Sequence, residues 1–405
     1  MRDREFQAKI LGIEPPWVVH DVEVRTQPDK VVTTSVRYDG QACCPRCGRS
    51  AGKHDHRQRR WRHLDIYEYR AYVVVQVPRI RCPEHGVVQL DVPFADGRSG
   101  FTALFERLVI SLLHEMSLSA VARSLRLSWD EVDGIMARAV QRGMARRSQR
   151  ELRRIGIDET SVKKRYRFFT IITDLVSGEV VWVGAGRGKA TLDGFWRSLS
   201  LGQRERLEGI AMDMASPYVQ ATLEHVPDAH RKIVFDKFHV VRQLTHAVDL
   251  ERRAASRDDA GLKHTRYAWL RRPASMGHAE RIAFARLRRQ HARVGRAWSI
   301  KELFGQFWGY HDVAAARRFF ARWYGWAVRS RLGRMVAVAR LLKQRFENIV
   351  TYLSMPITNA LAESINAKVQ WVKYQARGFR NESRFARAIY FHCAGLDLSP
   401  SHQYA

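Results

Sequence analysis

The sequence of 405 residues lacks several features that would place it in particular protein classes. It has no apolar run of about 18 residues, the length at which a membrane-spanning helix is suspected. Its first residues, MRDREFQAKILGIEPPW, lack the apolar core of a secretory signal peptide. Its five cysteines are too few for a disulfide scaffold. These absences predict a cytoplasmic protein with reduced thiols and no membrane partner.

Acidic residues are also scarce relative to basic ones. The chain has 69 Lys and Arg against 41 Asp and Glu, a formal net charge of +28. Such an excess is the electrostatic signature of a nucleic-acid-binding protein. Hydrophobic residues make up 45% of the chain, enough for buried cores in several domains. We therefore predict a multidomain globular protein that binds nucleic acid.

Two short motifs, CPRCG at residues 44–48 and CPEHG at residues 82–86, have the form of metal-binding knuckles. In each motif, two residues that can bind a metal are separated by two others. The glycine that follows lets backbone amides turn toward the ligands. The alternating stretch at residues 59–81 predicts a β-hairpin between them. Four protein ligands leave no open position, so we predict a structural Zn²⁺ site formed by Cys44, Cys47, Cys82 and His85.

Other residues near the knuckles leave alternatives open. Cys43 could replace Cys44 only with an unusual three-residue spacing. His54, His56 and His63 are rival ligands, although their basic surroundings favour a surface that faces phosphate. The thiols could also be small buried residues that bind no metal.

Residues 101–142 have the pattern of consecutive helices. Apolar residues at helical spacing over 118–125 predict one helix, and Ser128 with Glu131 forms a capping box that begins another. Helix, short turn and capped helix are typical of a helix-turn-helix, with an ordinary helical hairpin as the alternative. Asp130 and Asp133 lie near the start of the second helix and would repel phosphate, so the expected DNA contact is Arg138, further along.

From residue 155 onward, short apolar strands alternate with helical segments. In the predicted strands IGIDET and LEGIAMDM, the apolar run finishes with an acid, Asp158 in the first and Asp213 in the second. A carboxylate inside a sheet is costly unless a positive group lies beside it. Converging carboxylates suit Mg²⁺, and two such ions can activate a water or a 3′-hydroxyl for attack on a phosphodiester. We predict a site for two Mg²⁺ ions, or Mn²⁺; Glu159 should point to the opposite face of its strand.

A third acid for this site is expected in the helical segment at residues 354–381. Glu363 lies opposite the apolar stripe of that helix, on a face that also carries Asn359 and Asn366. Basic residues follow: Lys368, Lys373, Arg377 and Arg380. This arrangement favours Glu363 as a metal ligand beside basic residues that contact the phosphates of DNA. A solvated glutamate is the alternative.

The chain resembles the bacterial insertion-sequence transposases of the ISL-three family along almost its whole length. CPRCG…RRWRHLD…RCPEHG resembles the amino-terminal zinc finger of that family. IGIDETSVKK, AMDMASPY, IVFDKFHVV and TNALAESINAKV…ARGFRN resemble its catalytic segments in the same order. Family members often have Ser-Asn-Gly where this chain has Thr358-Asn359-Ala360, a departure that leaves Glu363 untouched.

The resemblance implies a ribonuclease-H-like catalytic core with a DDE triad at Asp158, Asp213 and Glu363. It also implies an all-helical insertion, because Asp213 and Glu363 are too far apart for a bare core of this type. Asp236 and His239 match a D-x-x-H motif that precedes such insertions. Their role would be positioning or hydrogen bonding beside the metal, and a histidine packed in the core is the alternative. The implied domains are a β-rich zinc-binding domain (1–98), a helix-turn-helix (99–150), the two parts of the core (151–240 and 351–405) and the insertion (241–350).

The implied function is that of a DNA transposase. It would bind double-stranded DNA at terminal inverted repeats, cleave the element ends by metal-dependent hydrolysis and join the 3′-hydroxyl ends to target DNA, as a homodimer or larger assembly. We expect it in the bacterial cytoplasm, on the nucleoid when DNA-bound. Arg59, Arg60 and Arg62 are further expected DNA contacts. An inactive or domesticated DNA-binding protein and a nuclease without strand transfer are the alternatives.

Overall fold

The computed structural model describes residues 3–96, 99–148, 151–163, 167–357, 360–376, 378–379 and 381–400. The chain forms two compact units, one of Met1–Ser148 with Leu396–Ala405 and one of Gln149–Gly395. Each unit has its own hydrophobic core. Among the helices of the described residues, none has the length and hydropathy needed to cross a bilayer.

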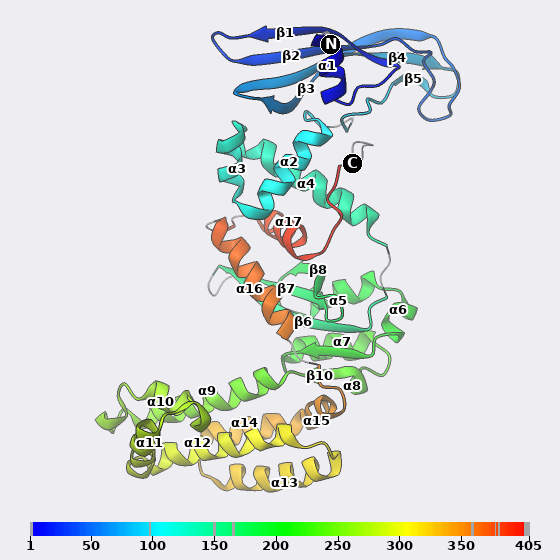
Figure 1. The fold of residues 1–405 in the computed structure, drawn as a ribbon. Helices are drawn as coiled ribbons and strands as arrows, with labels where there is room; N and C mark the ends of the chain where they lie inside the picture. The colour runs from blue at the N-terminus through cyan, green and yellow to red at the C-terminus, as the bar shows by residue number, and fades with distance from the viewer. Residues whose placement is uncertain are drawn as a thin grey trace. The chain divides into compact units, whose positions relative to one another are not determined.

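The first unit contains a five-stranded sheet with the order β1-β2-β4-β3, and β5 pairs with β4 (Figure 1). The predicted hairpin is confirmed: β3 and β4 are long antiparallel partners, with Trp61 opposite Val73. The elements are α1 (Asp3–Ile10), β1 (Trp17–Arg25), β2 (Val31–Tyr38), β3 (Lys53–Ile66), β4 (Tyr69–Cys82) and β5 (Gly86–Gln89).

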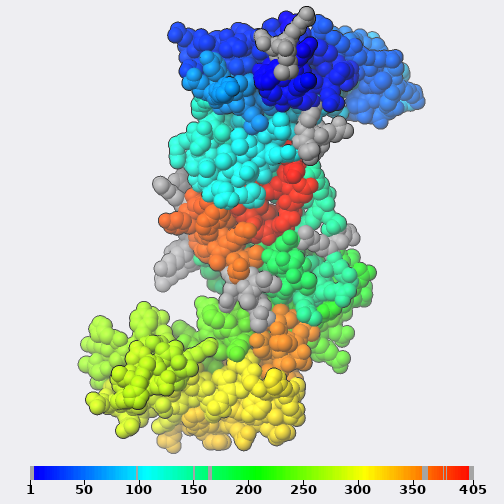
Figure 2. All heavy atoms as spheres, viewed as in Figure 1, coloured from blue at the N-terminus to red at the C-terminus, as the bar shows by residue number. Residues whose placement is uncertain are grey.

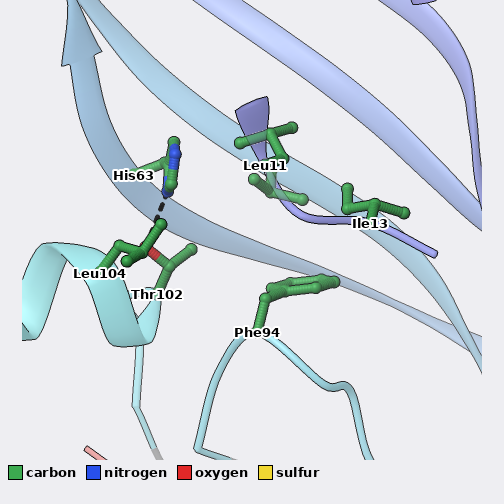
Figure 3. A pocket seen from close by; sticks show the side chains of 7 residues that line it. Leu11, Ile13, His63, Phe94, Thr102 and Leu104 are labelled. Carbon is green, nitrogen blue, oxygen red and sulfur yellow. Dashed lines mark hydrogen bonds between the residues drawn. The ribbon is translucent and has the colours of Figure 1, made fainter. Parts of the chain in front are cut away.

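His63 on β3 is a core residue of this unit. Figure 3 shows its ring beside Leu11, with its Nδ1 atom 2.8 Å from Thr102 Oγ1. Burial, helped by the adjacent Arg62, lowers the pKa of His63 to about 4, so the ring is neutral at pH 7. The expectation that His63 belongs to a phosphate-facing surface is therefore wrong, because its ring is buried and hydrogen-bonded to Thr102 inside the core.

Three helices follow in the same unit: α2 (Ala103–Glu115), α3 (Leu118–Leu125) and α4 (Trp129–Arg146). The predicted capping box is present, since Ser128 Oγ accepts from Glu131 N and Glu131 Oε2 accepts from Ser128 N. Arg126, between α3 and α4, has left-handed backbone angles that end α3 sharply. The helix-turn-helix geometry thus comes from a local stop and a local start signal.

The second unit has a five-stranded sheet of order β10-β9-β6-β7-β8 (Figure 1). β6, β7 and β8 form an antiparallel meander, while β9 pairs parallel to β6 and β10 parallel to β9. The strands are β6 (Arg154–Lys163), β7 (Arg167–Asp174), β8 (Glu179–Ala185), β9 (Gly209–Met212) and β10 (Ile233–Phe235).

Helices cover both faces of this sheet. On one face, Ile157 of β6 shares a core with Phe195 and Tyr218 from two helices. On the other, Phe385 packs edge-on against Phe169 of β7, with their ring centroids 5.1 Å apart. The helices that flank the sheet or connect its strands are α5 (Lys189–Ser198), α6 (Leu201–Glu205), α7 (Ser216–His225), α8 (Ala229–Lys232), α16 (Ala360–Gln375) and α17 (Glu382–Cys393).

A helical region lies between β10 and α16 in the chain. Its helices are α9 (Lys237–Ala255), α10 (Arg266–Leu270), α11 (His278–Gln290), α12 (Ala292–Phe304), α13 (Val313–Arg329), α14 (Gly333–Gln344) and α15 (Phe346–Ser354). Trp269, Trp298 and Trp323 are buried in it. The region returns to the sheet through α15, where Asn348 Nδ2 donates to Ile233 O at 3.2 Å. Figure 2 shows the orange residues of α15 beside green residues near the sheet.

Candidate functional site

Asp158 and Asp213 lie next to each other because of strand register. Ile157 of β6 pairs with Met212 of β9 in the parallel ladder, and each acid is the next residue along its strand direction. Neighbouring strands are about 4.8 Å apart, so the two carboxylates emerge from adjacent positions of the sheet. The structure therefore brings together the first two acids that the sequence singled out.

Both carboxylates are held by local hydrogen bonds. Asp158 Oδ1 accepts from Glu159 N at 2.7 Å, and Asp213 Oδ1 accepts from Met214 N at 2.6 Å. Burial raises the pKa of Asp158, and the charge of Asp213 adds to this effect, while the amide of Glu159, His239 and Asn366 oppose it. A raised carboxyl pKa marks a position where a positive charge would be stabilising.

The Asp236 and His239 pair divides into two roles. Asp236 is buried at the start of α9 and caps that helix, because its Oδ1 accepts from Phe238 N at 3.0 Å. His239 lies one turn later, with its Nδ1 atom 3.9 Å from Asp213 Oδ2. Thus Asp236 positions the helix, and His239 faces the carboxylates.

Helix α16 is tied to strand β6 by polar side chains at helical spacing. Asn366 Nδ2 donates to Asp158 Oδ2 at 2.5 Å, Gln370 Nε2 donates to Thr160 Oγ1 at 2.9 Å, and Lys373 Nζ donates to Ser161 O at 2.7 Å. These contacts hold the helix beside the acids.

Several predicted residues of this segment lie outside the described part of the structure. They are Asn359, Arg377 and Arg380, together with the side chain of Glu363, whose backbone belongs to α16. Lys368 is described and exposed on α16, where it is available to a phosphate.

A cleft of about 450 Å³ begins at the acids and follows α9. Its walls include Glu159, Asp213 and His239, so Glu159 borders the same cleft as Asp213. Burial raises the pKa of Glu159, and Arg187 partly offsets this. Further along, Arg242 and Arg253 line the cleft. We did not predict this basic face, although the helical spacing of cationic residues after the D-x-x-H motif was a usable signal.

The four predicted zinc ligands converge at the open end of the β3–β4 hairpin, where β3 begins and β4 ends. The ligand atoms of Cys44, Cys47, Cys82 and His85 all lie within 4.8 Å of one another. Individual separations are 3.8 Å from Cys44 Sγ to His85 Nδ1, and 3.7 Å between the sulfurs of Cys47 and Cys82. A tetrahedron with Zn–S bonds of about 2.3 Å has edges of about 3.8 Å, so this donor set fits Zn²⁺.

The knuckle backbone supports this donor set. Gly48 and Gly86 have φ values of +72° and +66°, a conformation that other residues rarely adopt. Burial opposes ionisation of Cys44, but hydrogen bonds from the backbone of Arg46 and Cys47 outweigh it and lower the pKa of the thiol. Cys43 is exposed and outside the group.

The predicted DNA contact Arg138 is only partly exposed, with 25% of its side chain accessible, and it is held in an ion pair. Its Nη2 and the Nη1 of Arg142 lie 2.6 and 3.0 Å from the carboxylate of Glu106, which is 1% exposed on α2. Ser99 Oγ also donates to Glu106 at 2.8 Å. These arginines therefore clamp α4 onto α2, which argues against a phosphate contact by Arg138.

The three arginines of β3 differ in their surroundings. Arg62 is 5% exposed, forms an ion pair with Asp65 and donates to His63 O at 2.9 Å. It serves the fold, contrary to our expectation of a DNA contact. Arg60 is exposed with its guanidinium 3.5 Å from the ring centroid of Tyr72, and Arg59 lies 4.7 Å from that of Trp61. These two remain candidate DNA contacts.

Adjacent carboxylates, one within β6 (Asp158) and one directly after β9 (Asp213), occur with a Cys₃His cluster and a helix-turn-helix in one strongly basic chain. Asp158 therefore does not end its strand as the sequence suggested, because β6 continues to Lys163. Together these features define a DNA-processing protein. Comparison with protein families gives the particular class. Residues 155–389 match a model described as "Transposase", of the DDE type in family ISL3. Residues 90–140 match the "Helix-turn-helix domain of transposase family ISL3", and residues 40–85 match the "zinc-finger of transposase IS204/IS1001/IS1096/IS1165". The chain belongs to the ISL3 family of insertion-sequence transposases, as its sequence motifs predicted.

Curated relatives agree with this assignment. The chain is 29% identical to the transposase for insertion sequence element IS1557 of Mycobacterium tuberculosis (strain H37Rv), over 94% of this chain and 93% of the relative. It is 26% identical to the transposase for insertion sequence element IS1001 of Bordetella parapertussis, over 95% and 97% respectively. The protein is thus a transposase with a helix-turn-helix DNA-binding domain and a zinc ribbon.

Proposed function

We propose that this transposase cleaves DNA at the ends of its insertion sequence by metal-dependent hydrolysis and joins the 3′-hydroxyl ends to target DNA. The observation that carries the proposal is the adjacent placement of Asp158 and Asp213 by the β6–β9 register, in a unit whose family is that of DDE transposases. The raised pKa of Asp158 supports a cation at this position.

We infer that Glu363 completes the catalytic acids. It precedes Asn366 by three residues in α16, so the two positions belong to one helical face, and Asn366 donates to Asp158. Asp158, Asp213 and Glu363 would hold two Mg²⁺ ions, which lower the pKa of an attacking water and offset charge on the leaving oxygen. His239 would orient Asp213, and Asn366 would orient Asp158.

The proposed architecture is a ribonuclease-H-like core interrupted by an all-helical insertion. The antiparallel meander β6–β8 joined to parallel β9 and β10 supports the core, and the run of helices from α9 to α15 supports an insertion near residues 241–350. We retain the boundaries 1–98 and 99–150 for the zinc-binding and helix-turn-helix domains. For the two parts of the core we retain 151–240 and 351–405, except that Leu396–Ala405 group with the first compact unit.

The amino-terminal domains would recognise the terminal inverted repeats. Zn²⁺ bound by Cys44, Cys47, Cys82 and His85 would stiffen the end of the long hairpin, on which Arg60 presents its charge. Joining two element ends requires both active sites in one assembly, so we propose that the protein acts as a dimer or larger oligomer.

Cleavage of the flanking DNA tests the catalytic proposal. A duplex carrying an end of this element should be cut by the purified protein only with Mg²⁺ or Mn²⁺, and Asp158→Asn and Asp213→Asn should each lower the rate at least about a thousand-fold. Asp228→Asn is the matched control, because Asp228 is exposed and has left-handed backbone angles that Asn also tolerates. Normal cutting by either active-site variant would overturn the assignment. Binding without cutting by the unmodified protein would favour a DNA-binding function alone.

A further inference from the structure

The cleft beside the acids extends well beyond them. From His239 to Arg253 it follows α9 for fourteen residues, a rise of about 21 Å at 1.5 Å per residue. It then reaches Arg266 and Leu270 on α10. The acids at one end are thus connected to a long wall formed by the helical region.

Charge is distributed unevenly along this cleft. The carboxylates Glu159 and Asp213 lie at the β6–β9 end, whereas Arg242, Arg253 and Arg266 line the remainder and are exposed. Arg253 and Arg266 retain 56% and 52% of their side-chain exposure. The far wall can therefore offer guanidinium groups to an anion.

The acid within the basic wall does not cancel it. Asp249 is 4% exposed, and its Oδ1 is bound by the buried Arg252 at 2.8 Å. That internal pair is neutral, so the charges of Arg253 and Arg266 are in excess. Both lie near Asp249 Oδ2, at 2.8 and 3.8 Å, and this carboxylate orients them along the cleft.

The spacing fits a polyanion better than a single anion. Arg242, His246 and Arg253 recur on one face of α9, at positions separated by one and two helical turns. Each turn rises about 5.4 Å, which is similar to the separation of successive phosphates along one DNA strand. A cleft of about 450 Å³ has the size of a small-molecule pocket and accommodates a stretch of one strand, but no duplex.

We propose that the α9–α10 cleft binds the sugar-phosphate backbone of a single DNA strand that continues past the cleavage point. Arg242, Arg253 and Arg266 contact phosphates spaced along the strand, which runs away from Asp213 along α9. This inference rests on the proposed cleavage function, because the acids define where the strand enters the cleft. It gives the helical region a substrate-binding role that the acids alone do not imply.

The test compares two DNA probes by fluorescence anisotropy, without added Mg²⁺ so that no cutting occurs. One probe is a blunt duplex of the element end that flanks this gene. The other is the same duplex with an unpaired tail past that end, and it is prepared in two forms, with the tail on one strand or on the other. The full-length variant Arg242→Gln/Arg253→Gln/Arg266→Gln should bind one tailed probe at least about ten-fold more weakly. Loss of three single-strand phosphate contacts should reduce the salt slope for that probe by about 2. Binding of the blunt duplex should change less than about two-fold.

The matched control removes the same charge elsewhere in the helical region. Arg322, Arg334 and Arg340 are exposed on α13 and α14 and do not line the cleft, so their triple Gln variant should bind both probes normally. No loss for any tailed probe, equal loss for both probes, or equal loss in the control variant would overturn the inference. Cutting by Asp213→Asn would instead overturn the proposed active site, so the two failures are distinguishable.

Discussion

At the scale of single residues, burial decides which of the basic side chains serve the fold. His63 and Arg62 lie in a segment rich in positive charge, and both are buried and form hydrogen bonds inside the first unit. Arg60, two residues before Arg62, is exposed. Adjacent residues of similar chemistry therefore have opposite roles, which leads to two predictions.

Neutral His63 should make the first unit sensitive to acid. Its pKa is about 4 when folded and about 6.5 when unfolded, so the unfolded state binds more protons between these values and stability falls as the pH decreases through that range. The loss attributable to His63 is about 2 kcal/mol at pH 5. The variant His63→Asn keeps a polar group that can replace Nδ1 toward Thr102. Between pH 7 and pH 5, its free energy of unfolding, measured with denaturant, should fall by about 2 kcal/mol less than that of the unmodified protein. An unchanged pH dependence would contradict the assignment.

Substitution of the two hairpin arginines should separate folding from DNA binding. Arg62→Gln should lower the free energy of unfolding by about 2 to 3 kcal/mol, because buried carbonyls and Asp65 lose a charged donor. Arg60→Gln should lower stability by no more than about 1 kcal/mol, through loss of the contact with the Tyr72 ring. It should reduce the salt slope of duplex binding by about 0.9, the value for one phosphate contact. Thermal melts and salt titrations measure the two effects, and the reverse pattern would show that Arg62 contacts DNA.

At the scale of elements, a buried carboxylate fastens the helix-turn-helix. Glu106 on α2 receives Arg138 and Arg142 from α4, with only 2% of its side chain exposed. Removal of one partner of a buried ion pair leaves uncompensated charge, which is more damaging than loss of an exposed pair. The packing of α4 on α2 therefore depends on an internal ion-pair contact.

Glu106→Ala should destabilise the first unit by about 3 to 5 kcal/mol in chemical unfolding. Glu68→Ala is the control, since Glu68 forms an ion pair with Lys30 in which both side chains are largely exposed, and its loss should change the midpoint little. Similar midpoints for both variants would show that the Glu106 cluster contributes no more than a surface pair.

At the scale of the whole molecule, two separate cores predict two unfolding transitions. Each compact unit buries its own hydrophobic cluster, and the Cys₃His group belongs to the first. A structural metal stabilises only the unit that binds it. Perturbation of the zinc ligands should thus affect one transition and spare the other.

Calorimetry of the full chain should show this selectivity. A zinc chelator, or Cys47→Ser, should lower the melting temperature of one transition and leave the second in place, with metal analysis showing loss of zinc. Cys43→Ser is a closely matched control, because Cys43 is exposed and outside the ligand group. Retention of zinc by Cys47→Ser, or its loss from Cys43→Ser, would contradict the ligand assignment.

The sequence by itself determined the features that depend on short stretches of chain. Ser128 and Glu131 form the predicted capping box, Gly48 and Gly86 complete the knuckles, and the acids of IGIDET and AMDM end or interrupt apolar strands. The family followed from the order of these motifs, because each motif is local and the combination is specific. These features depend on propensity, spacing and charge, which neighbouring residues define.

Tertiary structure alone decided which distant groups meet. Arg138 binds Glu106, 32 residues earlier, and Asn366 reaches Asp158 across 208 residues. The β6–β9 register set Asp158 beside Asp213, and the packing of α9 against the core turned its basic face into a cleft wall. No local pattern contains this information, because burial and pairing depend on which remote surfaces exclude water from a side chain.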